Sequence, residues 1–470
     1  MAFRTLTAVF AVSATLFSVA PFAKPQVSNT PKNIIMVVGD GMGPAYTSAY
    51  RYFKDNDLSN GVDRTVLDRI FVGSASTYPA EESGIVTDSA AGATALATGF
   101  KSYNGAISVD TDRKPLNTVL RQAKRNGMKT GLAVTSQIVH ATPAAYVTHN
   151  ESRKNYNEIA NHFFDDRING EFVVDVMLGG GLSYFEREDR DLVAEFIDSG
   201  YQFTDSYNKL ATYSEGQKLL GLFAPIGLPW ALDDKRPHRL SYMAKHAIKH
   251  LENDNGFFLL IEASQVDWAG HANDIASAMA EMDDLAKTME FLIEYVEENP
   301  DTLVVLTADH STGGLTIGAD HEYKWEPKWI RNMQSSVTQI AEEILDERAP
   351  SEFVSEQLGF DLNKDEQQIV ANLSNVEALR DREAEIKKIV DSRTNTGWTT
   401  GGHTGIDVPV FSVGQGSYLF TGSIDNTDIA KTIFALLDSK IGSSKKTKRK
   451  DVSKSTDNEE ACNFKTSWVC

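Results

Sequence analysis

Short runs of apolar residues recur along the chain and alternate with longer stretches of helical periodicity. The runs cover residues 33–38, 130–135, 256–262, 303–308 and 408–413. Because they are continuous and rich in Val, Ile and Leu, they indicate strands that are buried on both faces. The stretches 116–126, 275–298 and 427–438 have the pattern of helices that cover such strands. The sequence therefore predicts an α/β fold, an α/β/α sandwich with a largely parallel central sheet.

The chain divides by composition into a main body, an insertion and a tail. Residues 24–440 hold all five apolar runs and are expected to form the main body. The stretch 311–402 differs in character, with a long segment rich in Glu, Asp and Lys, and we interpret about 320–397 as an insertion on the body. Residues 441–470 start with a Lys/Arg cluster followed by Ser, Asp and Glu, which is typical of a polar, flexible tail. A role of this tail in sorting or surface attachment is the alternative.

The first residues match the three-part pattern of a secretory signal peptide. Arg4 precedes an apolar run from Leu6 to Ala20, and small residues follow up to Ala23. We therefore expect residues 1–23 to be a signal peptide and the protein to be periplasmic or secreted; a buried N-terminal helix is the alternative. No other stretch approaches the roughly 20 apolar residues that cross a bilayer, so we expect no membrane span.

The charge balance limits the possible partners. A formal net charge of −19 repels nucleic acid and anionic membranes, and so argues against a nucleic-acid-binding role. An anionic substrate would need a local reversal of this field, which bound divalent cations supply. The chain has two cysteines, Cys462 and Cys470, both near its end, so a disulfide could form only within the tail.

One serine lies at the expected start of a helix. In Thr87-Asp88-Ser89, an Asp-Ser pair opens the run of small residues 90–98. A hydroxyl at this position lies beside free backbone N–H groups and the positive end of the helix dipole, which attract an anion. The pattern is compatible with a nucleophile at a phosphate site, but Ser or Asp before such a run is more often a plain helix N-cap.

Histidines and aspartates follow several of the predicted strands. The candidate metal ligands are Asp40, Asp267, His271, Asp309, His310 and His403. Because ligand sites in open α/β sheets lie beyond the carboxyl ends of the strands, we expect these side chains to converge. Imidazole nitrogen and carboxylate oxygen are the ligands that zinc takes in catalytic sites, and three His with three Asp would fit two such sites.

A further carboxylate directly follows five apolar residues. Glu262 comes after the run 257–261, and burying its charge is unfavourable unless the side chain is paired or bound to a metal. Together with the hydroxyl of Thr142 it would form an oxygen-rich site of the kind that magnesium prefers. A half-exposed glutamate at a strand end is the alternative.

Four motifs in this order resemble those of the alkaline phosphatase family. They are GDGMG (39–43), TDSAAGATALATG (87–99), TADHSTGG (307–314) and GGHTG (401–405), and the similarity runs from about residue 33 to 437. The resemblance implies hydrolysis of phosphate monoesters to inorganic phosphate and an alcohol, through a phosphoserine on Ser89. It also implies two Zn²⁺ and one Mg²⁺ per subunit, and a homodimer.

The resemblance also assigns residues to the three metals. Asp267, His271 and His403 match the ligands of the first zinc. Asp309, His310 and Asp40 match those of the second zinc. Asp40, Glu262 and Thr142 match the magnesium site, and Arg153 matches the arginine that holds the phosphate.

Two positions differ from the best-studied enteric pattern of the family. His140 stands where that pattern has an aspartate near the third metal, and Trp268 stands where it has a lysine after the zinc-binding aspartate. The His/Trp pair is similar to that of marine, cold-active members, and both residues are expected to lie at the substrate site. The change leaves the reaction class intact and leaves the affinity of the third site open.

Other functions share parts of this pattern. Phosphodiesterases, sulfatases and cofactor-independent phosphoglycerate mutases resemble the family in fold and ligands, but the Cys/Ser-x-Pro-x-Arg motif of a sulfatase does not occur in the sequence. A metal- or phosphate-binding protein without turnover would need no nucleophile. Ser89 at the helix start favours the enzyme.

Overall fold

The apolar runs lie side by side as strands of one sheet in the computed structural model, which describes residues 30–55, 61–236, 238–346 and 349–450. The order across the sheet is β16-β2-β15-β10-β1-β9-β3-β6-β8-β7. The five strands that arise from the predicted runs are β1 (Asn33–Gly39), β3 (Lys129–Gln137), β9 (Phe257–Ala263), β10 (Thr302–Thr307) and β15 (Val408–Gly414). The others are β2 (Phe71–Ser76), β6 (Val176–Gly180), β7 (Gln202–Thr204), β8 (Leu219–Leu222) and β16 (Gly422–Asp425).

The sheet is parallel except at one strand. Neighbouring strands pair in parallel from β10 through β1, β9, β3, β6 and β8 to β7, and β16 pairs in parallel with β2. Only β15, among the strands described, runs antiparallel to both its neighbours, β10 and β2. The predicted α/β fold with a largely parallel sheet is therefore confirmed.

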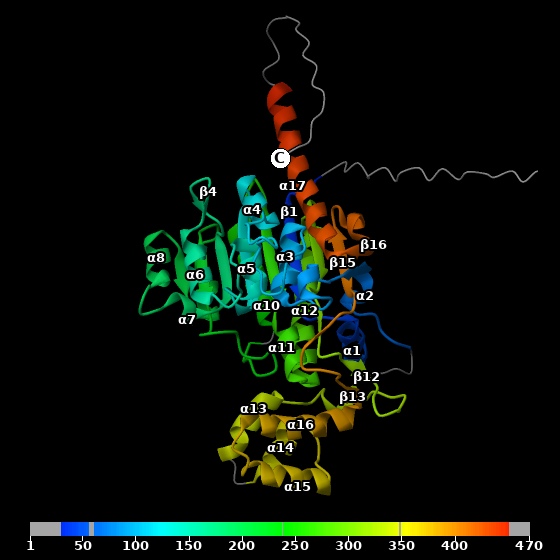
Figure 1. Cartoon of the computed structure of the whole chain (residues 1–470). Coiled ribbons are helices and arrows are strands. Elements are labelled where there is room, and N and C mark those ends of the chain that lie inside the picture. Colours follow the sequence, from blue (N-terminus) through cyan, green and yellow to red (C-terminus); the bar gives the residue numbers. More distant parts are fainter. Residues whose placement is uncertain (1–29, 56–60, 237, 347–348, 451–470) are drawn as a thin grey trace, which may run out of the picture.

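Helices cover both faces of the sheet (Figure 1). On one face α10 (Arg239–Leu251) packs against β3, β9 and β6, and α12 (Ile275–Glu298) packs beside α10. On the other face lie α3 (Ser89–Thr98), α4 (Val119–Arg125), α5 (Ala141–Val147) and α17 (Asn426–Lys450), which contact one another. The remaining helices of the body are α1 (Pro44–Lys54), α2 (Val66–Ile70), α6 (Tyr156–Asp165), α7 (Leu182–Phe185), α8 (Leu192–Asp198), α9 (Tyr207–Leu210) and α11 (Gln265–Ala272).

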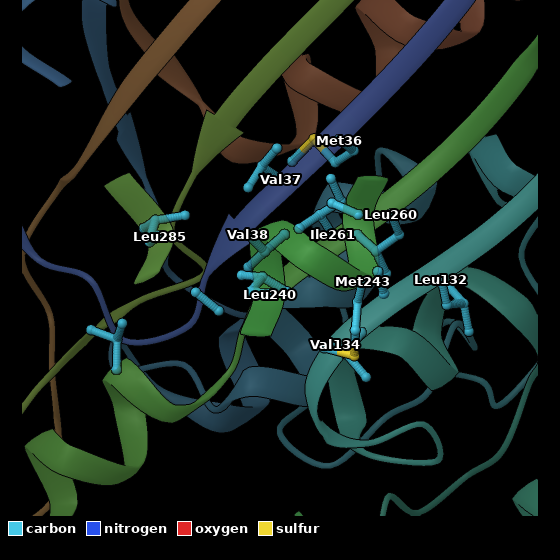
Figure 2. Packing of buried hydrophobic residues seen from close by; sticks show 14 of the residues in the cluster. Met36, Val37, Val38, Leu132, Val134, Leu240, Met243, Leu260, Ile261 and Leu285 are labelled. Carbon is cyan, nitrogen blue, oxygen red and sulfur yellow. The ribbon is translucent and has the colours of Figure 1, made fainter. Parts of the chain in front are cut away.

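The core lies between the sheet and these helices. Figure 2 shows the layer beneath α10, where Leu240 and Met243 lie near Val38 of β1, Val134 of β3 and Ile261 of β9. These side chains are fully buried. Burial of a side chain of this size contributes roughly 1.5–3 kcal/mol, so the central strands, and with them the positions of their carboxyl ends, are strongly fixed.

The chain between β10 and β15 builds a separate helical unit. It contains α13 (Val337–Glu343), α14 (Pro350–Leu358), α15 (Lys364–Leu373) and α16 (Leu379–Thr394), which lie together apart from the sheet in Figure 1. Short strands join the two ends of this segment: β11 (Ser311–Thr312) pairs with β14 (His403–Thr404), and β12 (Thr316–Ile317) with β13 (Thr396–Gly397). The helical unit is the segment that the sequence assigns to an insertion.

The C-terminal helix is longer than the sequence pattern indicates. The periodicity predicts a helix over 427–438, whereas α17 continues to Lys450 because the Lys-rich segment also favours helix. Residues 441–450 of α17 therefore belong to the segment that the sequence assigns to a polar tail. Residues 1–23, assigned to a signal peptide, and residues 451–470 with both cysteines lie outside the described residues. Among the residues described, no helix has the length and hydropathy needed to span a bilayer.

Candidate functional site

Three neighbouring strands deliver carboxylates to one edge of the sheet. Asp40 follows β1, Glu262 lies near the end of β9, and Asp309 with His310 follows β10. Since β9, β1 and β10 are adjacent and parallel, their carboxyl ends meet. All four side chains are completely buried. The convergence that the sequence predicts is thus present in the structure.

Two further elements bring the remaining histidines to this edge. Helix α11 begins just after β9 and carries Asp267 and His271, which are four residues apart and so lie on one face. Nε2 of His271 is 3.3 Å from Oδ2 of Asp267, and Nε2 of His403 on β14 is 3.6 Å from Oδ1 of Asp267. The two Nε2 atoms are 3.1 Å apart. Both imidazoles therefore present Nε2 to one small volume.

The other ring nitrogen of each of these histidines faces a main-chain carbonyl. Nδ1 of His403 is 2.9 Å from the oxygen of Thr87, and Nδ1 of His271 is 2.7 Å from the oxygen of Gly401. An N–H donated to these carbonyls places the proton on Nδ1 and leaves the Nε2 lone pair free. This arrangement is typical of metal-ligating histidines.

Three groups of side chains have ligand atoms close enough to share a metal ion. They are Asp267 with His310 and His403, Asp40 with Asp309 and His310, and Asp40 with His140 and Glu262, each within 4.8 Å. His310 is common to the first two groups and Asp40 to the last two. Thr142, the second residue of α5, is buried and lies close to Glu262. All the residues proposed as ligands from the sequence are therefore gathered in one place.

Buried oxygens in this cluster lack donors. Both oxygens of Asp40, Oδ2 of Asp309 and Oε1 of Glu262 have no hydrogen-bond partner among the described residues. A buried carboxylate without a partner is strongly unfavourable, and a bound cation removes the penalty. The donor set, oxygens with imidazole nitrogens, also fits divalent metals.

The pKa values of the metal-free cluster also favour a bound cation. Burial, followed by the charge of Asp267, raises the pKa of Asp309 to about 8. Burial raises the pKa of Glu262 to about 7, and burial and the charge of Asp309 raise that of Asp40. Burial and the neighbouring His403 lower the pKa of His310, so its imidazole is neutral. The protein thus concentrates carboxylates that resist ionisation until positive charge is supplied.

Ser89 is the first residue of α3 and lies beside this cluster. Asp88 caps the helix by accepting a hydrogen bond from the N–H of Ala91 at 2.9 Å. Oγ of the buried Ser89 is 3.1 Å from Nε2 of His310, which belongs to two of the three ligand groups. The hydroxyl therefore faces the potential metal sites from the positive end of a helix.

Two side chains hold the guanidinium of Arg153 in place. Its Nη1 donates to Oδ2 of Asp88 at 3.0 Å, and its Nη2 is 3.0 Å from Nε2 of His140. Burial, reinforced by the charge of Arg153, lowers the pKa of His140 to about 3, so His140 is neutral and accepts this bond. The ring of Trp268 contacts His140 edge to face, with centroids 5.9 Å apart. The structure thus brings His140, Arg153 and Trp268 together.

Two residues of the site have roles that the sequence pattern did not predict. Asp88 caps α3 and also holds Arg153. The hydroxyl of Thr312 donates to Asp267 and is 3.2 Å from Nδ1 of His310. Thr312 lies within the motif TADHSTGG, so the sequence pointed to this residue, but only the fold shows that its hydroxyl contacts Asp267 and His310.

Comparisons with known proteins agree with this site. A model of the alkaline phosphatase family matches residues 31–439. Alkaline phosphatase 3 of Bacillus subtilis is 46% identical over 412 residues, which cover 86% of this chain and 89% of that protein.

The chain belongs to the alkaline phosphatase family. Solved structures of the family superpose on it. A cold-active alkaline phosphatase from the psychrophile Shewanella sp. is 50% identical, with a TM-score of 0.81 and coverage of 86% of this chain and 99% of that one. The alkaline phosphatase of the Antarctic bacterium TAB5 is 28% identical, with a TM-score of 0.66 over 87% and 99% of the two chains. The protein is accordingly a metal-binding phosphoric monoester hydrolase.

Proposed function

We propose that Ser89 is the nucleophile of this alkaline phosphatase and that Arg153 holds the transferring phosphate. The observation that carries the proposal is the position of Ser89 Oγ, at the start of α3 and 3.1 Å from His310 Nε2. Ser89 Oγ attacks phosphorus, the bond from phosphorus to the ester oxygen breaks, and the alcohol leaves with a proton. Water then cleaves the phosphoserine, which releases inorganic phosphate and restores the hydroxyl.

We assign two Zn²⁺ and one Mg²⁺ to this cluster, with the ligand sets that the family resemblance implies; these sets differ from the three geometric groups in placing His271 at the first zinc and Thr142 at magnesium. Asp267, His271 and His403 would hold the first zinc, and Asp309, His310 and Asp40 the second. Asp40, Glu262 and Thr142 would hold magnesium, with His140 beside them. Bound there, these cations would lower the pKa of the serine hydroxyl and neutralise charge on the phosphoryl oxygens and the leaving group.

The protein's own residues position the phosphate. The start of α3 would offer its N–H groups to a phosphate bound next to Ser89. The guanidinium of Arg153 can donate to two phosphate oxygens at once, and Asp88 fixes its orientation. His140 and Trp268 complete the substrate site beside the third ligand group. Fixed donors of this kind contribute through positioning, which supplies a large part of the rate in phosphoryl transfer.

We also propose that the enzyme is exported from the cytoplasm and that it forms a homodimer. A signal peptide over 1–23 would place the enzyme in the periplasm or outside the cell. The family resemblance supports a homodimer, and light scattering of the mature protein would give the mass that tests it.

The nucleophile is tested with Ser89→Ala. We expect the variant to fold and to retain metal, but to lose the covalent intermediate and at least about 100-fold in kcat. The measurements are turnover of p-nitrophenyl phosphate with and without chelator, metal content, and trapping of phosphate on the enzyme at low pH. Trapped phosphate on any residue other than Ser89 would show the assignment to be wrong.

A further inference from the structure

A glycine lies directly against the ring of Trp268. This residue, Gly227, belongs to the loop 224–231, which lies between β8 and α10. A Cβ atom built on Gly227 would be 2.4 Å from both Cη2 and Cζ3 of Trp268, closer than real Cβ atoms come to any atom. Gly227 is not among the described glycines with positive φ. Contact with the indole, and not backbone conformation, is therefore what excludes a side chain at this position.

The loop is held on both sides of Gly227. Before it, the oxygen of Ala224 accepts from the N–H groups of Gly181 and Leu182 at 2.9 and 3.0 Å. After it, the N–H of Leu228 donates to the oxygen of Thr135 at 3.0 Å. The loop therefore cannot move away from Trp268 without breaking several hydrogen bonds.

A buried arginine connects the same loop to the core. Arg239 is fully buried, and its Nη2 donates to Gln265 Oε1 at 2.6 Å and to Glu281 Oε1 at 2.9 Å. The amide of Gln265 in turn donates to the oxygen of Leu228, and Glu281 accepts from the N–H of Ala231 at 2.8 Å. Because buried charge-assisted bonds of this kind are strong, the network makes the loop a rigid support for the indole.

The other contact of the indole leads to the phosphate site. Trp268 meets His140 edge to face, and His140 accepts the hydrogen bond from Nη2 of Arg153. The indole therefore has Gly227 at its outer edge and His140 as a second neighbour. These two contacts are the route by which a change in the position of the ring would reach His140 and, through its hydrogen bond, Arg153.

We propose that Gly227 is a positioning residue: its bare backbone, held by the Arg239 network, sets the place of the Trp268 ring and thereby the affinity of the site for phosphate. The inference rests on the proposed role of Arg153 in holding phosphate. It adds a specific function for a loop that contributes no ligand and no nucleophile.

The test compares Gly227→Ala with the same change in a Trp268→Ala background, both as metal-loaded enzymes. The added methyl group overpacks the indole, so we expect the single variant to raise the inhibition constant for inorganic phosphate, and KM in parallel, by about fivefold or more. In the Trp268→Ala background the methyl group has room, so Gly227→Ala should cause no further change in the phosphate inhibition constant or in KM. Pro229→Ala, at an exposed position of the same loop, is the control and should leave both constants unchanged.

The outcomes separate this inference from the proposed function. Arg153→Ala should itself raise the phosphate inhibition constant; if it does not, the proposed function fails. If Arg153→Ala raises it but Gly227→Ala does not, the positioning role is wrong. The positioning role is also wrong if Gly227→Ala raises the phosphate inhibition constant by the same factor in the wild type and in the Trp268→Ala background. Should Gly227→Ala fail to fold, folding restored by Trp268→Ala supports the contact, and failure of the double variant contradicts it.

Discussion

Single side chains in the site are oriented by partners that do not themselves react. Carbonyl oxygens of Thr87 and Gly401 set the ring orientation of His403 and His271, and Asp88 sets that of Arg153. Oriented donors and acceptors of this kind lower the reorganisation needed during the reaction. The orientation of each of these side chains thus depends on one or two hydrogen bonds.

His140 lies in one of the three potential ligand groups. Its Nδ1 is buried without a partner among the described residues, and it shares a potential ligand group with Asp40 and Glu262. Magnesium prefers oxygen and negative charge over a neutral imidazole.

We therefore predict that His140→Asp tightens magnesium binding, by about tenfold in the concentration that half-restores activity. The measurement is a magnesium titration of the chelated and zinc-reloaded enzyme. His162→Asp makes the same exchange on α6, away from the ligand groups, and is the matched control. Equal magnesium affinity in the wild type and His140→Asp would show that this position does not tune the third site.

At the scale of elements, the helical unit contacts the end of α11, the helix that carries Asp267 and His271, two of the proposed ligands. Nζ of Lys387 on α16 donates to the oxygen of Ala272, the last residue of α11, at 2.6 Å. A cation at a helix C-terminus stabilises the helix through its dipole and satisfies a free carbonyl. The N–H of Val337 on α13 also donates to Asp274, next to the same helix end.

Lys387→Met should accordingly loosen α11. We predict a loss of about 0.3–1 kcal/mol in stability and faster loss of activity in chelator, because Asp267 and His271 are less firmly held. Lys388→Met is the matched control, since Lys388 is largely exposed and pairs with Glu385 on its own helix. Chelator inactivation at the same rate in both variants would argue against support of the metal site by the helical unit.

For the whole molecule, the cluster of buried carboxylates couples metal binding to stability. In the metal-free protein the pKa of Glu262 is raised to about 7 and that of Asp309 to about 8 by burial, against about 4 in an unfolded chain. Between these values the two carboxyl groups bind more protons in the folded state than in the unfolded state. Their contribution to the stability of the metal-free protein therefore falls as pH rises from about 4 to about 8.

Metal binding removes this penalty, so its stabilising effect should grow with pH. We predict that chelation lowers the melting temperature slightly at pH 5 and much more at pH 8. Thermal melts of chelated and metal-loaded protein across this range measure the difference. A gap that is constant or narrows with rising pH would contradict the assignment of the buried carboxylates to the metal sites.

Patterns of neighbouring residues were enough to predict the parallel sheet and the helix that begins at Ser89. Continuous apolar runs predict buried strands whatever the rest of the chain does, and polar residues directly after them must lie at the strand ends. For this reason Asp40, Glu262 and Asp309 were identified without a structure. The end of α17 was predicted too early, because the end of the apolar periodicity does not by itself stop a helix.

The sequence by itself determined the local elements and the chemistry at their ends, because both depend on residues that are close along the chain. Only the tertiary structure decided which distant groups meet. Asp88 and Arg153 are 65 residues apart, and Thr87 and His403 are 316 apart, so no local pattern reports their hydrogen bonds. The contact of Gly227 with Trp268 likewise depends on a loop and a helix brought together by packing. Such contacts arise from the burial of the whole core, and local sequence carries little information about them.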